Sequence, residues 1–255
     1  MSYSAWNISA CRPEAPEPLA RAGYTPLLAA ILCRRGLDTP EAAQAFLEGG
    51  PELLVDPFLL EDMDRAAARL RLAIERRETV AVFGDYDVDG ITSACLVTSW
   101  LRSKGLECST YIPDRMEEGY GLNLAAMDTL HARGASLVVT VDCGITAAEE
   151  ARYASALGMD MIITDHHECG SGSLPDALAV VDPKRPDCTY PNKGLAGVGV
   201  AFKLLCAVDG DAEALLDSYA DLVGAGTVAD VSEAVAECFR ASTIVLAAPT
   251  YNGGI

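Results

Sequence analysis

The sequence contains little positive charge, few aromatic residues and very little histidine. Its 255 residues include 19 Lys and Arg against 37 Asp and Glu, a formal net charge of −18, and only 6% of them are aromatic. A basic face and aromatic stacking platforms are the usual signs of a protein that binds nucleic acid. Their scarcity does not exclude such a partner, because acidic residues also gather where divalent cations bind, and these cations let an anionic substrate approach carboxylates.

Long apolar runs and paired cysteine motifs are also missing. No uncharged apolar stretch reaches the roughly 18 residues of a membrane span, and the first residues lack the basic-then-apolar order of a signal peptide. The nine cysteines are scattered and never spaced Cys-x-x-Cys, which indicates neither a zinc knuckle nor a disulfide framework. Half of the residues are hydrophobic, enough for a sizeable core. We therefore expect a soluble cytoplasmic protein with reduced thiols.

The length favours one large domain with a small appendage. Residues 1–63 are expected to form an arm followed by a helical hairpin, in which Thr39 is the N-cap of the second helix and Pro40 its first residue. Residues 64–231 are expected to form the main domain, which begins with an amphipathic helix over 64–77.

The main domain alternates between two periodicities. Short runs rich in β-branched residues predict strands over 79–83, 107–112, 137–141, 161–163 and 178–181. Helical stretches lie between most of them, around 91–103, 123–133 and 146–157. This alternation predicts an α/β fold with a twisted, mostly parallel sheet of about five strands flanked by helices. Ligands of such sheets bind beyond the carboxyl ends of the strands.

Acidic and histidine residues gather at those strand ends. Any one of them could be only a helix N-cap, and Asp182, which precedes Pro183, could be only a turn residue. Together they would repel one another strongly at one edge of the sheet unless cations held them. They are Asp85, Asp87 and Asp89 after the first strand, Asp142 after the third, Asp165, His166, His167 and Glu168 after the fourth, and Asp182 after the fifth.

The types of side chain indicate which cations these are. Carboxylates with one or two imidazoles and no thiolate fit Mn²⁺ or Mg²⁺ better than a structural zinc ion. Two such ions that share a carboxylate would activate a water molecule and stabilise the charge on a phosphoryl group. The sequence has no Gly-x-x-x-x-Gly-Lys-Ser/Thr loop, no Gly-x-Gly-x-x-Gly at the first turn, no Gly-x-Ser-x-Gly elbow, and no closing Glu for an EF-hand. The pattern predicts phosphoester hydrolysis with two divalent ions.

Three ordered motifs resemble those of the DHH phosphoesterase superfamily. They are Asp85-Tyr86-Asp87-Val88-Asp89-Gly90, Asp142-Cys143-Gly144 and Asp165-His166-His167. Within this superfamily the sequence is most similar to the RecJ family of bacterial exonucleases, and the resemblance runs from about residue 25 to residue 231. It implies a metal-dependent hydrolase that degrades single-stranded DNA from the 5′ end in DNA repair and recombination.

The resemblance also implies roles for individual residues. Asp142, His166 and His167 would be catalytic, with Asp142 bridging the ions and His167 contacting the scissile phosphate or protonating the leaving oxygen. Asp165 would orient one of the two imidazoles. The implied metal ligands are Asp85, Asp87, Asp89, Asp142, His166 and Asp230. Asp85 could instead contact one of the other ligands without binding an ion itself. The implied substrate contacts are Arg115, Tyr120, Asn123, Gly197 and Gly199, the two glycines through N–H groups at a helix start.

Several alternatives stay open. The family continues beyond this length with a second lobe and an oligonucleotide-binding barrel, so the chain could instead act on short oligonucleotides or cyclic dinucleotides. It could also be a silent binding module or an inert fragment, and the sequence leaves the oligomeric state open. Residues 232–255, expected to be an incomplete piece outside the main domain, resemble part of the flavodoxin domain of flavodiiron proteins. No flavin is expected, because the phosphate-binding loop that opens a flavodoxin is absent.

Overall fold

The computed structural model describes residues 16–49, 54–114, 116–119, 121–170 and 172–238, without the side chains of 231–238. The chain divides into two compact units, residues 1–54 with 233–255 and residues 55–232. Among the described residues, no helix has both the length and the apolar character of a membrane span. The flavodoxin-like loop of the sequence lies at 249–254, outside the described residues, and stays a prediction.

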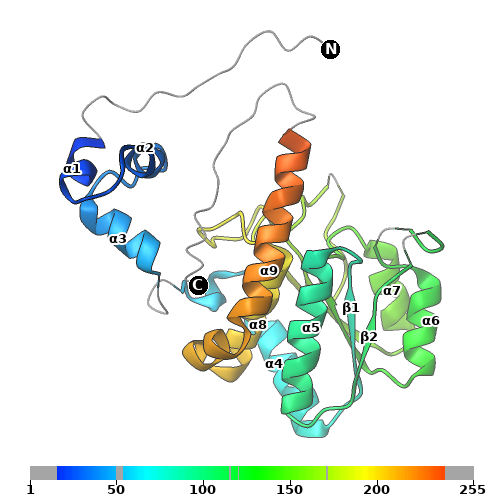
Figure 1. The fold of residues 1–255 in the computed structure, drawn as a ribbon. Coiled ribbons are helices and arrows are strands. Elements are labelled where there is room, and N and C mark those ends of the chain that lie inside the picture. Colours follow the sequence, from blue (N-terminus) through cyan, green and yellow to red (C-terminus); the bar gives the residue numbers. More distant parts are fainter. Residues whose placement is uncertain (1–15, 50–53, 115, 120, 171, 239–255) are drawn as a thin grey trace, which may run out of the picture. The chain divides into compact units, whose positions relative to one another are not determined.

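Three short helices form the described N-terminal segment of the first unit (Figure 1). They are α1 (Pro16–Arg21), α2 (Pro26–Arg34) and α3 (Pro40–Glu48). The hydroxyl of Thr39 accepts a hydrogen bond from the N–H of Ala42 at 3.2 Å, which confirms the predicted N-cap of α3. A small apolar cluster joins the three helices through Leu19, Leu32 and Ala43.

A parallel sheet of five strands forms the centre of the second unit and confirms the predicted fold class. The strands follow the order β2-β1-β3-β4-β5 across the sheet. Every residue of the central strand β3 and of its neighbour β1 is buried, as expected of a sheet covered on both faces. The strands are β1 (Val80–Gly84), β2 (Cys108–Tyr111), β3 (Leu137–Val141), β4 (Asp160–Thr164) and β5 (Ala179–Val181).

Helices cover both faces of this sheet (Figure 1). On one face α6 and α7 pack on an apolar cluster that includes Phe83, Met127 and Ile163. On the other face α8 packs against both α4 and α5. The helices of this unit are η2 (Pro57–Leu59), α4 (Met63–Arg76), α5 (Val88–Ser103), α6 (Leu124–Ala132), α7 (Ala148–Ala156), α8 (Gly197–Asp209) and α9 (Ala212–Cys238), the last of which runs a few residues past the unit.

A buried arginine fastens the start of α4 to the end of the sheet. Arg185, whose side chain is 7% exposed, donates hydrogen bonds to the carboxylates of Asp62 and Asp187 and to the carbonyl of Val180. Burial by itself would raise the pKa of Asp62, but the hydrogen bonds from Arg185, the Val180 N–H and Arg65 outweigh it, so this pKa lies below its ordinary value. The folded state therefore favours ionised Asp62.

We expect Arg185→Met to lower the free energy of unfolding by about 3 kcal/mol at neutral pH, because Asp62 keeps its charge and loses its buried cationic partner. The lowered pKa makes the contribution of Asp62 fully present above the ordinary carboxyl pKa, and this contribution is lost as the pH falls through the lowered value. Urea unfolding should therefore show a difference between wild type and variant that shrinks below about pH 4.

The matched control is Arg76→Met. Arg76 is 65% exposed and lies 4.0 Å from Glu78, so its replacement should change the free energy of unfolding by less than about 0.5 kcal/mol. Equal losses in the two variants would contradict the importance assigned to the buried arginine.

Candidate metal centre

Four buried aspartates stand in a row, one directly after each of four adjacent strands. The register of the parallel pairs aligns the last residues of β1, β3, β4 and β5, so the residues that follow them lie side by side. Carboxylates are rarely buried together unless they are protonated, accept hydrogen bonds or bind cations. The four are Asp85, Asp142, Asp165 and Asp182, each 3% exposed or less.

Six further ligand candidates surround Asp142 at this edge. Together with Asp142 they form three groups, and within each group the candidate ligand atoms lie within 4.8 Å of one another. Asp142 belongs to two of the groups and His166 to two, so the groups overlap. The structure thus brings together all six ligands that the family resemblance implied, and His167 as well. The groups are Asp85 with Asp87 and Asp142, Asp142 with His166 and His167, and Asp89 with His166 and Asp230.

Asp142 is the least compensated carboxylate of this centre. The Nε2 of His166 lies 3.1 Å from its Oδ1, but neither Asp142 oxygen accepts a hydrogen bond within the described part of the chain. Burial, followed by the charges of Asp89 and Asp87, raises the pKa of Asp142 to about 10. Its backbone also has a φ of 61°, a conformation that few residues other than glycine adopt. This combination fits a carboxylate that binds divalent cations.

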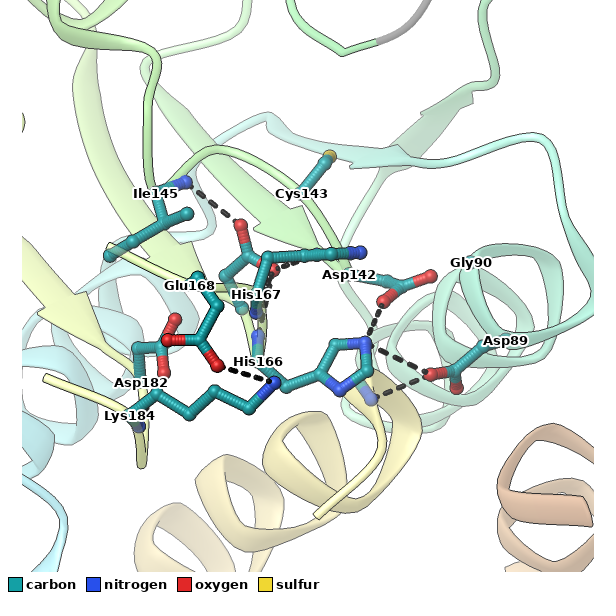
Figure 2. A network of polar contacts seen from close by, with 12 residues as sticks. Asp89, Gly90, Asp142, Cys143, Ile145, His166, His167, Glu168, Asp182 and Lys184 are labelled. Carbon is teal, nitrogen blue, oxygen red and sulfur yellow. Dashed lines mark hydrogen bonds and ion pairs between the residues drawn. The ribbon is translucent and has the colours of Figure 1, made fainter. Parts of the chain in front are cut away.

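Asp89 is held by the start of α8 (Figure 2 shows it beside His166). The N–H groups of Gly197 and Val198 donate to its two oxygens at 2.6 and 2.9 Å. Burial raises the pKa of Asp89 more than these hydrogen bonds lower it. The N–H of Gly197, expected to receive a substrate phosphate, instead donates to the Asp89 carboxylate, and we correct its role accordingly.

Two glycines let helices approach the carboxylates closely. A Cβ at Gly197 would lie 2.5 Å from Oδ1 of Asp142, and a Cβ at Gly226 would lie 2.4 Å from the hydroxyl of Thr92 and 2.9 Å from Asp89. Gly226 was not among the expected site residues, since only its tertiary contact with α5 reveals its role. The sequence feature that could have indicated this role is its position, four residues before Asp230 on the same helix.

Asp165 holds His167 rather than the ring of His166. Its Oδ1 accepts hydrogen bonds from Nδ1 of His167 at 2.7 Å and from the N–H groups of both histidines, while its Oδ2 accepts one from the N–H of Ile145 at 2.8 Å. Burial would raise the pKa of Asp165, yet the hydrogen bond with His167 and the other donors bring it below its ordinary value. The same hydrogen bond raises the pKa of His167 despite burial. The His167 ring lines a cavity of about 250 Å³ beside Gly144, Thr146 and Glu150.

The expected substrate contacts are only partly described. Arg115 and Tyr120 lie outside the described residues. Asn123 caps α6, since its Oδ1 accepts from the N–H of Ala126 at 2.7 Å and its Nδ2 donates to Glu118 at 3.0 Å. Asn123 thus caps α6, and its expected contact with a nucleotide stays a prediction. Gly199 is buried in the first turn of α8.

Comparison with known proteins gives consistent matches. A family model for the "DHH family, N-terminal domain" matches residues 79–227. The chain is similar to the single-stranded-DNA-specific exonuclease RecJ of Bacillus subtilis, with 48% identity over 207 residues, and to that of Escherichia coli, with 38% identity over 219 residues. Each match covers 81% of this chain, but the chain spans only 26% and 37% of the length of these two relatives.

Solved structures agree with these matches. The crystal structure of RecJ in complex with Mn²⁺ from Thermus thermophilus superimposes with a TM-score of 0.69 and 30% identity, over 89% of this chain and 32% of that one. A second crystal structure, of exonuclease RecJ bound to manganese, gives a TM-score of 0.61 and 36% identity, over 68% of this chain and 44% of that one.

We expect Gly197→Ala to damage the centre, because its Cβ would displace Asp142 or move α8 away from Asp89. The affinity for Mn²⁺ measured by calorimetry should fall by about 10- to 100-fold, and the free energy of unfolding by about 2 kcal/mol. Gly199→Ala is the control in the same helical turn, since its Cβ would meet only the flexible end of Leu195, at 3.2 Å. A Gly199→Ala variant as damaged as Gly197→Ala would show that the helix start, and not the contact with Asp142, matters.

We expect Asp142→Asn to stabilise the protein in the presence of a chelator. A raised pKa makes Asp142 cost stability above the ordinary carboxyl pKa, and this cost grows as the pH rises toward about 10. The variant should therefore unfold with a free energy about 2 kcal/mol higher than wild type at pH 8, and with a smaller advantage at pH 5. Mn²⁺ should stabilise the wild type and leave the variant nearly unchanged, as thermal unfolding would show. Equal stabilisation of both by Mn²⁺ would disprove the assignment of Asp142.

Proposed function

The chain belongs to the DHH family, and we propose that it is the metal-dependent part of an exonuclease that hydrolyses single-stranded DNA from the 5′ end and releases mononucleotides. The observation that carries this proposal is the buried carboxylate of Asp142, which accepts no hydrogen bond in the described structure and belongs to two overlapping ligand groups. The activity named for the RecJ relatives supports it, although the chain spans only part of their length.

Two divalent cations would be held by the carboxylates and the imidazole of His166. The ligand chemistry fits Mn²⁺ or Mg²⁺, and both manganese-bound RecJ structures share this fold. When bound, the ions would supply activation of a water molecule and neutralisation of charge on the phosphoryl group. The proposed ligands are Asp85, Asp87, Asp89, Asp142, His166 and Asp230, and Asp142 belongs to two of the three ligand groups.

The residues around these ligands hold them in place. The start of α8 fixes both oxygens of Asp89, so this carboxylate is oriented before any ion binds. Asp165 fixes the Nδ1 side of His167, whose ring belongs to one ligand group with Asp142. Because Asp165 raises the pKa of His167, the ring is a suitable donor of a hydrogen bond or proton to the scissile phosphate or the leaving oxygen.

The same centre would serve a phosphodiesterase for short oligonucleotides or cyclic dinucleotides. The scarcity of basic and aromatic residues favours this second candidate, because long single strands are usually bound by a basic groove with stacking platforms. Chain-length preference separates the two proposals.

The test is hydrolysis of 5′-phosphorylated single-stranded DNA with Mn²⁺, followed by identification of the products. We expect 5′-mononucleotides from the single strand and little release from the matching duplex. Asp142→Asn should lower the rate by about 10³-fold, because the ions contribute several kcal/mol of transition-state stabilisation. Asp128→Asn is the control. It changes an exposed carboxylate that accepts a hydrogen bond from the Tyr153 hydroxyl, and it should leave the rate unchanged.

Two results would count against the main proposal. If the Asp142→Asn variant kept most of the activity, hydrolysis would not depend on the proposed metal centre. Faster cleavage of dinucleotides than of long strands would establish the second candidate in place of the first.

A further inference from the structure

Lys184 is a basic residue that the proposed chemistry does not use, and it lies at the same edge of the sheet as the metal centre. It follows β5 by three residues, next to Pro183. Figure 2 shows its side chain extending toward Glu168 and His166. In a chain with a formal net charge of −18, a cation at this position needs an explanation.

The backbone and stem of Lys184 are anchored. Its N–H donates to Oδ1 of Asp182 at 2.7 Å, and Asp182 is fully buried at the end of β5. The Lys184 side chain is only 29% exposed, so most of its stem is covered, while the ammonium pairs with Glu168, the residue after His167. This anchoring limits the positions that the ammonium can take.

The carboxylate that pairs with Lys184 is easily replaced. Nζ of Lys184 lies 3.5 Å from Oε1 of Glu168, whose side chain is 86% exposed. Because Glu168 is exposed, water and salt compete with the pair, which contributes about 0–1 kcal/mol. By contrast, Arg185 is bound to Asp62 and Asp187 and is itself buried. A phosphate could therefore take the place of Glu168 at little cost.

The position of Lys184 relative to His166 indicates which phosphate it would meet. Nε2 of His166 faces Asp142 and Asp89, at 3.1 and 3.9 Å. In Figure 2 the Lys184 ammonium lies on the other side of the His166 ring from these two carboxylates. It is thus beside the proposed metal ligands rather than among them, and is placed for a phosphate other than the one at the ions.

We propose that Lys184 is a phosphate-binding residue, whose ammonium exchanges Glu168 for the phosphodiester adjacent to the scissile bond. The inference rests on the proposed function, since it needs a strand with more than one phosphate. Glu168 is the counter-ion that holds the ammonium in place until the strand arrives.

The test measures binding of a fluorescent, phosphorothioate-linked oligothymidylate, which resists hydrolysis, to the full chain in Mn²⁺ at several salt concentrations. Lys184→Met should raise Kd by about fivefold and flatten the slope of log Kd against log salt by about 0.7, the value for one phosphate contact of a single strand. Lys184→Arg should keep most of the affinity. Glu168→Gln, at an exposed position, should bind about twofold more tightly because the competing carboxylate is gone.

Lys104→Met is the matched control. Lys104 is also a paired lysine of similar exposure, 33%, with Nζ 2.6 Å from Asp209, but it follows the last residue of α5, at the opposite end from Asp89. A Lys184→Met variant with the affinity and salt slope of Lys104→Met would overturn the inference. Weaker binding by Glu168→Gln would overturn it as well.

Hydrolysis assays on the same proteins separate the two proposals. Strand binding that depends on Lys184, without release of nucleotides, would overturn the proposed function alone. Release of nucleotides with equal KM in Lys184→Met and Lys104→Met would overturn this inference alone. With thymidine 5′-(p-nitrophenyl phosphate), which has a single phosphodiester, Lys184→Met should leave KM unchanged. A raised KM there would show that Lys184 contacts the scissile phosphate instead.

Discussion

Repulsion among buried carboxylates is the constraint on which the rest of this structure depends. The parallel register brings four aspartates to one edge of the sheet, and each is compensated differently. Asp165 accepts hydrogen bonds from three backbone N–H groups and one imidazole, and Asp182 accepts one from the N–H of Lys184. Asp142 accepts none in the described structure, and it is the one shared by two ligand groups. The uncompensated carboxylate thus stands where cations would neutralise the most charge.

The helices on one face of the sheet are arranged to serve this edge. The start of α8 supplies two N–H donors to Asp89, and α9 brings Asp230 to the same group. Both approaches require a position without a side chain, Gly197 in α8 and Gly226 in α9. Glycine within a helix usually costs stability relative to alanine, about 0.5–1 kcal/mol. Glycine is nevertheless required at both positions, because a Cβ there would collide with Asp142 or Asp89.

Local patterns in the sequence were sufficient for the fold and for most of the candidate ligands. The β-branched runs predict the strands, and the residue just after a strand of a parallel sheet lies at the ligand-binding edge. The candidate ligands Asp85 and Asp142, and Asp165 that holds His167, therefore follow from spacing alone. Asp230 did not, because it belongs to a helix whose approach to the sheet is tertiary; only the family resemblance indicated it. The same limit explains Gly197, since a sequence shows that a helix start has free N–H groups but not which acceptor reaches them.

The net charge of the chain says little about the potential at this site. Charges separated by more than a Debye length, about 8–10 Å at physiological salt, are largely screened when they are exposed. Most acidic residues on the surface therefore do not act on a bound phosphate, whereas the groups at the sheet edge are buried and act strongly. At that edge the proposed cations would reverse the sign set by the aspartates, and Lys184 adds a positive charge beside them. An acidic protein can in this way bind an anionic strand, because the few groups nearest the phosphates determine the local field.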